Sequence, residues 1–510
     1  MLSSTPPHPW LLQRVLSGCA TDEGDSTIDM LTDNVLLEIF YFYQDLYRID
    51  PDGSNPSYRG PAMPLGDWRR LIHVCRRWRQ IIFESPRRLN LQILCTHENR
   101  FKKSLSIWPD FPIAIKYRSP FGLTSPIDQD DVIAALEHPN RVIRIEIISS
   151  QLGKLGTVLS HLHKPFPALT RLDLCSKDGI HDLPDEFLGG SAPCLEEITL
   201  SNISFPALPT LLLSAKDLVK LNLYGVPPTG HISPAALVAC LAELPRLDTL
   251  RFEYMWATVR VGQIHPLPIT RVILPALTRF QFIGISEYLE DLVAQIDCPE
   301  LEYIAVFYTN PVVDFQVAPL AKFLDRSVGP EMSPRRPTEV RLDNGSVAIK
   351  MYRDPNHPNE DLKPTTITIF YCWTDRQSSH IARVLDRFSA ILSTVAHLSL
   401  VSTDLPLGGA DDVDCLHLLL PFSATRTLHV SSELARHVAP ALEDIPAERI
   451  TKVLPSLCLT YFEGPKSSLE KFVAARGLSD RPVLVAGGKL EYDEILEYFV
   501  TEPEGVTKLE

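Results

Sequence analysis

The sequence predicts an α/β protein in which a short helical module precedes an irregular solenoid of strand-containing repeats. Three observations support this prediction. A triplet of apolar residues recurs along most of the chain, and a strongly apolar helical pattern lies near its start. The 43 prolines among 510 residues exceed the average share of about 5%. Because proline ends helices and central strands, we expect many short elements.

Length and composition set the broad class of the protein. The chain exceeds the roughly 250 to 300 residues at which single cores stop growing, so we expect several domains or an extended array. Hydrophobic residues make up 45% of the chain and charged residues 22%, which is ordinary for a folded protein. The net charge of −14 disfavours general binding to nucleic acids or to anionic membranes.

The ten cysteines are dispersed and form no C-x-x-C motif. The sequence therefore predicts neither a disulfide framework nor a cysteine-based metal site, and we expect the cytoplasm or the nucleus. No apolar run reaches the roughly eighteen residues that span a bilayer. Residues 1–27, expected to be a flexible N-terminus, lack the basic start of a secretory signal.

The helical module is placed at residues 28–94. Thr32, Asp33 and Asn34 supply helix-capping side chains ahead of residues 35–43, which are apolar nearly all the way round a helix. A helix with that distribution needs two burial surfaces.

A second helix is expected after a loop rich in proline and glycine. Asp67 is its predicted cap, and the Ser85-Pro86 pair ends it. Its apolar residues follow the spacing of one helical face: Trp68, Leu71, Ile72, Cys75, Trp78 and Ile82. Because so few residues cannot close a stable core alone, the apolar surplus is expected to pack on the next domain or on another protein. A helical cap of the repeat domain is the alternative.

Residues 31–40 and 68–79 together resemble the F-box, whose pattern opens with Leu-Pro and ends in Val-Cys-(Lys/Arg)-x-Trp. Here Thr32 replaces the proline, and residues 45–66 lengthen the first interhelical loop. That long loop and the continuation at residues 83–91 are similar to the F-box-like proteins of mushroom-forming fungi.

The resemblance implies three helices that dock on the Skp-type adaptor of a cullin-RING ubiquitin ligase. It also implies the adaptor-binding positions, which are Leu31, Val35, Ile39, Phe40, Val74, Cys75 and Trp78. Residues 68–103 carry ten Arg or Lys against two Glu, which raises nucleic-acid contact as an alternative. Solvated arginines, or arginine stems packed on apolar neighbours, are the more usual explanation, and we expect no nucleic-acid partner.

The repeats follow the pattern L-x-x-L-x-L of leucine-rich repeats. The triplets are Leu169-Leu172-Leu174, Leu195-Ile198-Leu200, Leu218-Leu221-Leu223, Leu247-Leu250-Phe252, Leu277-Phe280-Phe282 and Leu301-Ile304-Val306. Successive units begin 23 to 30 residues apart, close to the period of about 20 to 29 for this architecture. Weaker copies are Val142-Ile145-Ile147, Val395-Leu398-Leu400, Thr425-Leu428-Val430 and Leu454-Leu457-Leu459. The repeat domain is therefore placed at residues 95–480.

The last two apolar positions of each unit lie two apart on a strand and point into the core. The residues between and beside them point to the opposite face, which is the expected binding surface for a protein target. The target-binding candidates are Arg171, Asp173, Glu197, Lys220, Asn222, Arg251, Arg279 and Tyr303. The usual Asn or Cys, three residues after the last core position, is missing from these units.

Between residues 307 and 395 the repeat pattern is lost, and an insertion is expected at about residues 329–364. Residues 339–349 alternate and contain Asn344-Gly345, which predicts a β-hairpin. Residues 481–510 are expected to form an acidic cap or tail.

Motifs for chemistry are not evident. His161 and His163 lack the i, i+4 spacing of a helical metal pair, and Gly487-Gly488-Lys489 lacks the remainder of a P-loop. We expect no metal, no cofactor and no catalytic residue.

The sequence therefore predicts a substrate-recognition subunit of a Skp/cullin/F-box ubiquitin ligase that holds an unknown protein target on its repeats. A leucine-rich-repeat interaction scaffold without ligase association is the alternative.

Overall fold

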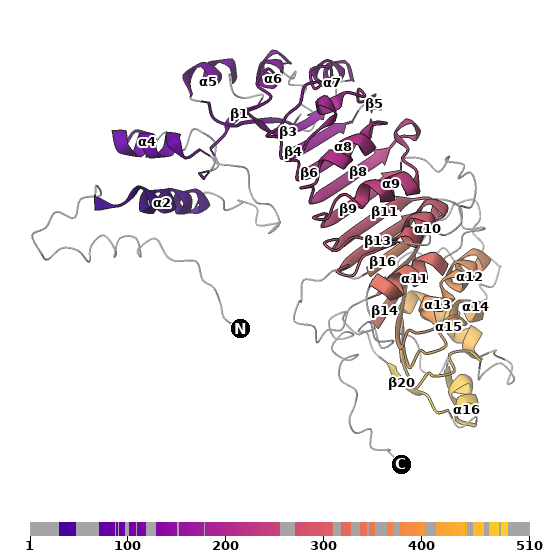
Figure 1. The fold of residues 1–510 in the computed structure, drawn as a ribbon. Coiled ribbons are helices and arrows are strands. Elements are labelled where there is room, and N and C mark those ends of the chain that lie inside the picture. The colour runs from indigo at the N-terminus through magenta and orange to yellow at the C-terminus, as the bar shows by residue number, and fades with distance from the viewer. Residues whose placement is uncertain are drawn as a thin grey trace, which may run out of the picture. The chain divides into compact units, whose positions relative to one another are not determined.

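The computed structural model divides the chain into two compact units, which are described separately. Unit 1 comprises residues 1–94 and 103–112, and unit 2 comprises residues 95–102 and 113–510 (Figure 1). The residues that the structure describes are 30–46, 71–86, 88–89, 91–96, 101–108, 110–118, 129–149, 152–177, 179–254, 271–309, 318–327, 337–343, 346–351, 365–370, 378–402, 415–443, 445, 452–463, 469–478 and 481–487. The flexible N-terminus expected at residues 1–27 lies outside them, as do residues 47–66 of the predicted long loop and the predicted cap Asp67. Residues 45 and 46, which the prediction places in that loop, are helical.

Unit 1 is built on helices α2 (Asp33–Leu46) and α4 (Arg76–Glu84). Thr32 begins α2, because its Oγ1 accepts a hydrogen bond from the Val35 amide at 3.4 Å, as the capping prediction requires. In the same unit, α4 contributes Ile82, which is fully buried. Strand β1 (Ile93–Cys95) and helix α5 (Phe101–Ile107) follow in the chain.

The predicted second helix is not continuous. Leu71 and Ile72 are helical, residues 73–74 form a turn, and Cys75 adopts an extended conformation with φ −154° and ψ 172°. The Cys75 Sγ then accepts a hydrogen bond from the Trp78 amide at 3.4 Å and begins α4. The apolar spacing continues through this break, so periodicity alone does not reveal it. The predicted end at Ser85 is confirmed.

Unit 2 contains one large, mostly parallel sheet. In chain order its strands are β2 (Ile113–Arg118), β3 (Val142–Ser149), β4 (Arg171–Ser176), β6 (Glu197–Ser201), β8 (Lys220–Val226), β9 (Thr249–Tyr254), β11 (Arg279–Gly284), β13 (Tyr303–Tyr308), β14 (Pro337–Asp343), β15 (Ser346–Met351), β16 (Thr365–Phe370), β17 (His397–Ser402), β18 (Thr427–Val430), β19 (Leu459–Phe462) and β20 (Leu484–Gly487). Within the unit the spatial order is β2-β3-β4-β6-β8-β9-β11-β13-β16-β15-β14-β17-β18-β19-β20.

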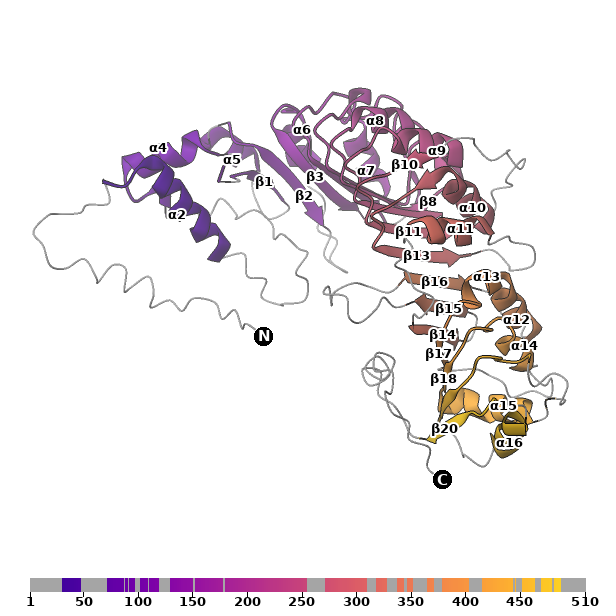
Figure 2. The same ribbon diagram turned by 60° about the horizontal axis from the view of Figure 1, so that its bottom comes forward.

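Helices connect these strands and lie on one side of the sheet (Figures 1 and 2). They are α6 (Gln129–Leu136), α7 (Leu152–Leu159), α8 (Leu208–Ser214), α9 (Pro234–Leu241), α10 (Ser286–Gln295), α11 (Ala318–Ser327), α12 (Ser378–Arg387), α13 (Ser389–Leu392), α14 (Cys415–Leu419), α15 (Ser432–Glu443) and α16 (Glu470–Leu478), with 3-10 turns η2 (Phe187–Gly190) and η3 (Pro228–Gly230). Two short parallel pairs accompany the sheet: β5 (His181–Asp182) with β7 (Ile203–Ser204), and β10 (Val272–Ile273) with β12 (Ile296–Asp297). The architecture is therefore a mixed α/β repeat scaffold.

The core between sheet and helices consists of the predicted triplets. Their last two positions lie in register on neighbouring strands, for example Leu172 beside Ile198 and Leu174 beside Leu200. Every such residue from β4 to β13 is at most 3% exposed. This confirms the predicted repeat pattern in that part of the chain.

The last weak repeat was placed three residues too early. In the register of β18 and β19, Leu428 lies beside Thr460 and Val430 beside Phe462. Thr460 and Phe462 are buried, whereas Leu459 is only half buried on the opposite face. A threonine at a core position hides this unit from a search for leucines.

The expected insertion at residues 329–364 contains the predicted hairpin, but the hairpin is part of the sheet. Strand β15 pairs antiparallel with β14 on one side and with β16 on the other. In turn, β16 is parallel to β13 and β14 is parallel to β17. The array therefore continues through the segment by a reversed strand. The two turn residues, Asn344 and Gly345, lie outside the described residues.

Two smaller features also differ from expectation. The predicted acidic cap or tail at 481–510 begins with a strand, because β20 pairs in parallel with β19; residues 488–510 lie outside the described residues. Asn202, one residue before the usual ladder position, donates from Nδ2 to the Ser176 carbonyl at 2.9 Å. It therefore satisfies loop backbone as the missing ladder residue would.

Candidate functional site

The first candidate surface consists of three exposed apolar side chains of unit 1, Val35, Ile39 and Val74, which are together called the outer face here. Val35 and Ile39 are one helical turn apart on α2 and are each 43% exposed, and Val74, in the turn before α4, is 56% exposed. Large apolar side chains are rarely left in water without a partner when they gather on one element. Met30 and Tyr41 of the same unit are also exposed.

The remaining predicted adaptor-binding residues belong to the interior of unit 1 or support its helices. Phe40 has no exposed surface and packs edge-on against Trp78, with 4.8 Å between ring centroids. Cys75 begins α4, and Leu31 is half buried. Helix α2 therefore has the two apolar faces that its composition predicts, one inward through Phe40 and one outward through Val35 and Ile39.

Arginines of unit 1 hold the start of α2. The Arg77 guanidinium donates to the Asp33 carboxylate at 2.6 Å and to the Leu31 carbonyl at 2.5 Å. Arg88 donates to Glu38 at 2.6 Å and to Asn34 at 3.1 Å. Two cations of the basic stretch thus have carboxylate partners inside the unit, which weakens the nucleic-acid alternative.

The second candidate surface is the side of the sheet away from the helices, here called the polar face. One row across it runs Arg171, Glu197, Lys220, Thr249, Arg279 and Tyr303, and the next runs Asp173, Thr199, Asn222, Arg251, Gln281 and Ala305. All eight predicted target-binding candidates lie in these rows and are half buried or exposed. Their placement on one face is confirmed. Thr249 and Ala305 share the face but are buried.

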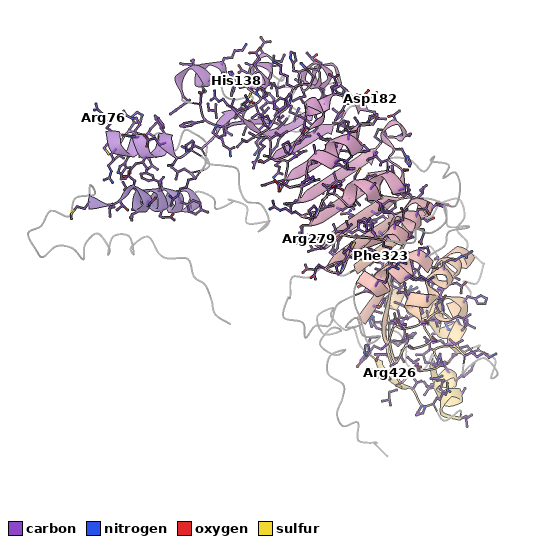
Figure 3. The ribbon with its side chains drawn as sticks, viewed as in Figure 1. Arg76, His138, Asp182, Arg279, Phe323 and Arg426 are labelled. Atoms are coloured by element: carbon purple, nitrogen blue, oxygen red, sulfur yellow. The ribbon has the colours of Figure 1, made fainter. Side chains whose placement is uncertain are left out.

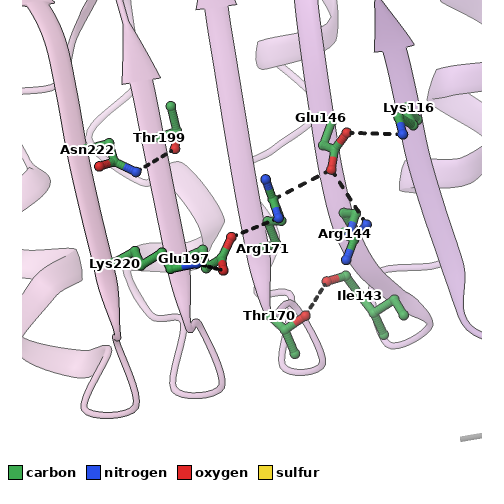
Figure 4. A network of polar contacts seen from close by, with 10 residues as sticks. All are labelled: Lys116, Ile143, Arg144, Glu146, Thr170, Arg171, Glu197, Thr199, Lys220 and Asn222. Carbon is green, nitrogen blue, oxygen red and sulfur yellow. Dashed lines mark hydrogen bonds and ion pairs between the residues drawn. The ribbon is translucent and has the colours of Figure 1, made fainter. Parts of the chain in front are cut away.

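On strands β3 to β8 the charges of the polar face neutralise one another (Figure 4). Glu197 accepts from Arg171 at 2.9 Å and from Lys220 at 2.9 Å. Glu146, only 3% exposed, lies 3.5 Å from Arg171 and 3.7 Å from Arg144. Its second oxygen lies 4.0 Å from Lys116 on β2. Glu146 and Glu197 thus each bridge two or more cations.

On strands β9 to β13 the polar face differs. Arg251 donates to the Tyr224 hydroxyl at 3.0 Å, and it is near enough to Tyr303 to oppose the rise that burial causes in the pKa of that phenol. Arg279 is exposed, and it is labelled in Figure 3. Among the described residues, neither Arg251 nor Arg279 forms an ion pair with a carboxylate.

Further along the sheet, a serine, a histidine and a glutamate form a buried chain that the sequence did not reveal. Ser399 Oγ lies 3.0 Å from His429 Nδ1, and His429 Nε2 lies 3.2 Å from Glu463 Oε1. Hydrolase triads use the same residue types. Here Ser399 is 6% exposed and His429 is 3% exposed, so the serine is not presented to a substrate.

Glu463 has a structural role in this hydrogen-bonded chain of side chains. Its second carboxylate oxygen accepts from the Ser432 amide at 3.0 Å, at the first residue of α15, where a negative charge is favourable. The chain of hydrogen bonds therefore ties β17, β18 and the start of α15 together. Only the strand register brings these residues together, because they lie about thirty residues apart in the sequence.

Among the described residues, no three His, Cys, Asp or Glu side chains lie close enough together to hold a metal ion. No helix among the described elements has the length and apolar character to cross a bilayer.

Comparisons with known proteins do not assign this chain to a family. No family model matches the sequence, and no curated protein matches it. Among solved structures, the chain is similar to the leucine-rich repeat-containing protein LegL7 from Legionella pneumophila, with 12% sequence identity and a TM-score of 0.27. The match covers 82% of this chain and 98% of that chain.

Proposed function

We propose that this chain is a substrate-recognition subunit of a Skp/cullin/F-box ubiquitin ligase. Unit 1 binds the Skp-type adaptor, and the repeats of unit 2 hold a protein target. The observation that carries the proposal is the outer face: three apolar side chains of the F-box-like segment that are exposed although the unit has its own buried core.

The division of roles inside unit 1 supports adaptor binding. Phe40 and Trp78 close the interior, and the Arg77 and Arg88 ion pairs hold α2 in place. Val35, Ile39 and Val74 are not needed for that interior. Covering them with a partner would remove apolar surface from water, which contributes about 25 cal/mol for each Å² buried.

The polar face supports target binding by the repeats. It presents half-buried charged and aromatic side chains on a rigid sheet, and sites on rigid elements hold their geometry better than sites on loops. Mixed charge on this face suits a protein target better than a polyanion.

A repeat scaffold without ligase association is the second candidate function. The favouring observation is that unit 2 forms one continuous sheet with a buried core. In that case unit 1 serves only as a helical cap, and the outer face contacts other partners.

Co-purification tests the proposal. Tagged full-length chain and a version lacking residues 28–94 are each mixed with purified Skp-type adaptor. The proposal predicts that the full chain captures the adaptor and that the shortened chain does not. Circular dichroism of the shortened chain serves as the control, because the repeats must remain folded for its failure to count.

If the full chain captures no adaptor, the ligase assignment is wrong. Equal capture by both versions would also contradict the proposal, because it would place adaptor binding outside the F-box-like module.

A further inference from the structure

The polar face is neutralised on one side and cationic on the other. From β3 to β8, Glu146 and Glu197 lie between the cations and bridge them at 2.9 to 3.7 Å. On β9 and β11 the cations continue as Arg251 and Arg279, while the positions beside them in register are Gln281 and Thr249. An amide and a hydroxyl thus occupy places where the earlier strands have carboxylates.

Glu253 is the acidic residue on the same face of β9, two positions after Arg251. Burial raises the pKa of its carboxyl group, and no cation counters that rise. No described residue forms an ion pair with it either. Glu253 therefore does not supply the missing counter-charge to Arg251.

Arg251 and Arg279 are close neighbours on the polar face. Arg251 pairs in register with Gln281, and Arg279 pairs with Thr249, so the arginines are diagonal neighbours, whose Cα atoms lie roughly 8 Å apart. Alternate residues of an extended peptide point to one side and are about 6.6 Å apart. Two acidic side chains at positions i and i+2 of such a peptide match this spacing.

Aromatic hydroxyls flank the arginines. Tyr224 holds Arg251 from β8 through a 3.0 Å hydrogen bond, and Tyr303 lies in the row of Arg279 on β13. Both phenols are half buried. An arginine that is held in place loses less freedom on binding, and an arginine–carboxylate pair can form two parallel hydrogen bonds.

We infer that Arg251 and Arg279, flanked by Tyr224 and Tyr303, form a binding site for an acidic peptide segment of a partner protein that carries carboxylates at alternate positions. The peptide supplies across strands β9 to β13 the carboxylates that Glu146 and Glu197 supply across β3 to β8. The inference rests on target binding by the repeats, which is one half of the proposed function, and it is independent of the ligase assignment.

Three pools of fluorescein-labelled peptides test the site. Each peptide has about twelve residues, with uncharged random flanks, and the centre of the three pools is Glu-x-Glu, Gln-x-Gln or phosphoserine-x-Ser. Binding to the full-length chain is followed by fluorescence polarisation. The inference predicts that the Glu-x-Glu pool binds about tenfold more tightly than the Gln-x-Gln pool, with affinity falling as salt rises. Equal binding of these two pools, or binding of the phosphorylated pool alone, overturns it.

Variants locate the site. Arg251→Gln with Arg279→Gln is expected to abolish the preference for the Glu-x-Glu pool. Arg246→Gln, which changes an exposed arginine paired with Asp217 at 2.9 Å, is the matched control and should keep it. Retention of the preference in the double variant overturns the inference.

A charge-reversal variant distinguishes loss of the binding site from loss of the fold. Arg251→Glu with Arg279→Glu should transfer the preference to a Lys-x-Lys pool, a gain that an unfolded protein cannot show, and no gain would count against the site. Adaptor capture is scored on the same preparations. A chain that captures the adaptor but ignores the acidic pool overturns this inference alone, and the reverse result overturns the ligase assignment alone.

Discussion

The ring of Trp78 packs edge-on against the ring of Phe40, with 4.8 Å between their centroids and 64° between their planes. This contact joins α4 to α2 inside unit 1, although both residues resemble the adaptor-binding positions of an F-box. Phe40 and Trp78 therefore hold the unit together, whereas Val35 and Ile39 remain exposed. Substitutions at the two kinds of position should therefore have different effects.

Replacing Trp78 with alanine should loosen unit 1. The substitution removes a half-buried ring and leaves a cavity beside Phe40, so we expect a loss of roughly 2 to 4 kcal/mol of local stability. Hydrogen exchange of the full chain, followed in peptides from α2 and α4, measures it. Val35→Ala should change exchange by less than about 0.5 kcal/mol, and equal effects of the two variants would contradict this assignment.

Glu146→Gln should destabilise unit 2 by roughly 1 to 3 kcal/mol, because it leaves Arg144, Arg171 and Lys116 without their shared buried carboxylate. Thermal melting of the full chain measures the loss. Lys116→Gln is the matched control: it removes one cation at 4.0 Å and should cost much less. Similar losses for both variants would show that Glu146 does not hold the cluster together.

The contribution of Glu290 to the stability of unit 2 should fall as the pH rises from about 4.5 to about 8. Burial raises the pKa of Glu290 from 4.5 to about 8, although the Leu320 amide and the Tyr308 hydroxyl act in the opposite direction. Over that window the folded chain keeps a proton that the unfolded chain has lost, so raising the pH favours unfolding.

Glu290→Gln should reduce this pH dependence, because its amide does not titrate. Melting temperatures at about pH 5.5 and about pH 8.5 provide the measurement, with the exposed Glu300→Gln as the control. A variant at Glu290 that loses as much stability as the wild type over this interval would show that the carboxyl group is not protonated in the fold.

Asn202 should tolerate glycine better than alanine. Its backbone has φ +56°, which glycine adopts freely and alanine does not, and both substitutions remove the bond to the Ser176 carbonyl. Denaturant unfolding should therefore place Asn202→Ala roughly 1 kcal/mol below Asn202→Gly. Equal stability of the two variants would indicate that only the side-chain bond matters.

Much of this arrangement follows from the sequence for physical reasons. Apolar triplets that recur every 23 to 30 residues predict the strands from β4 to β13, because only a two-residue alternation places Leu172 and Leu174 together in the core. The same alternation predicts which residues form the polar face. The break at Cys75 could not be predicted, because the apolar spacing continues through it and a cysteine side chain is an unusual cap.

Other features depend on long-range register. Thr460 stands at the core position where other units have leucine. The hairpin of β14 and β15 is part of the sheet because β16 pairs with β13, and these two strands are far apart in the sequence. Ser399 and His429 come from neighbouring strands and Glu463 directly follows the next one, so no local motif marks them. Likewise, the ion pairs of Glu146 depend on the register of β3 and β4, which no local sequence pattern specifies.

The affinity of purified Skp-type adaptor for the full-length chain tests the central claim most directly. Val35→Asp with Ile39→Asp places two charges on the outer face, each at a side chain that is 43% exposed. Ile180→Asp with Leu213→Asp makes the same change at side chains of unit 2 that are 45% and 48% exposed. Isothermal titration calorimetry should show measurable binding for the wild type and the unit 2 variant, with a loss of about a hundredfold or more for the outer-face variant. Equal affinity of all three proteins, or no binding by the wild type, would contradict the account.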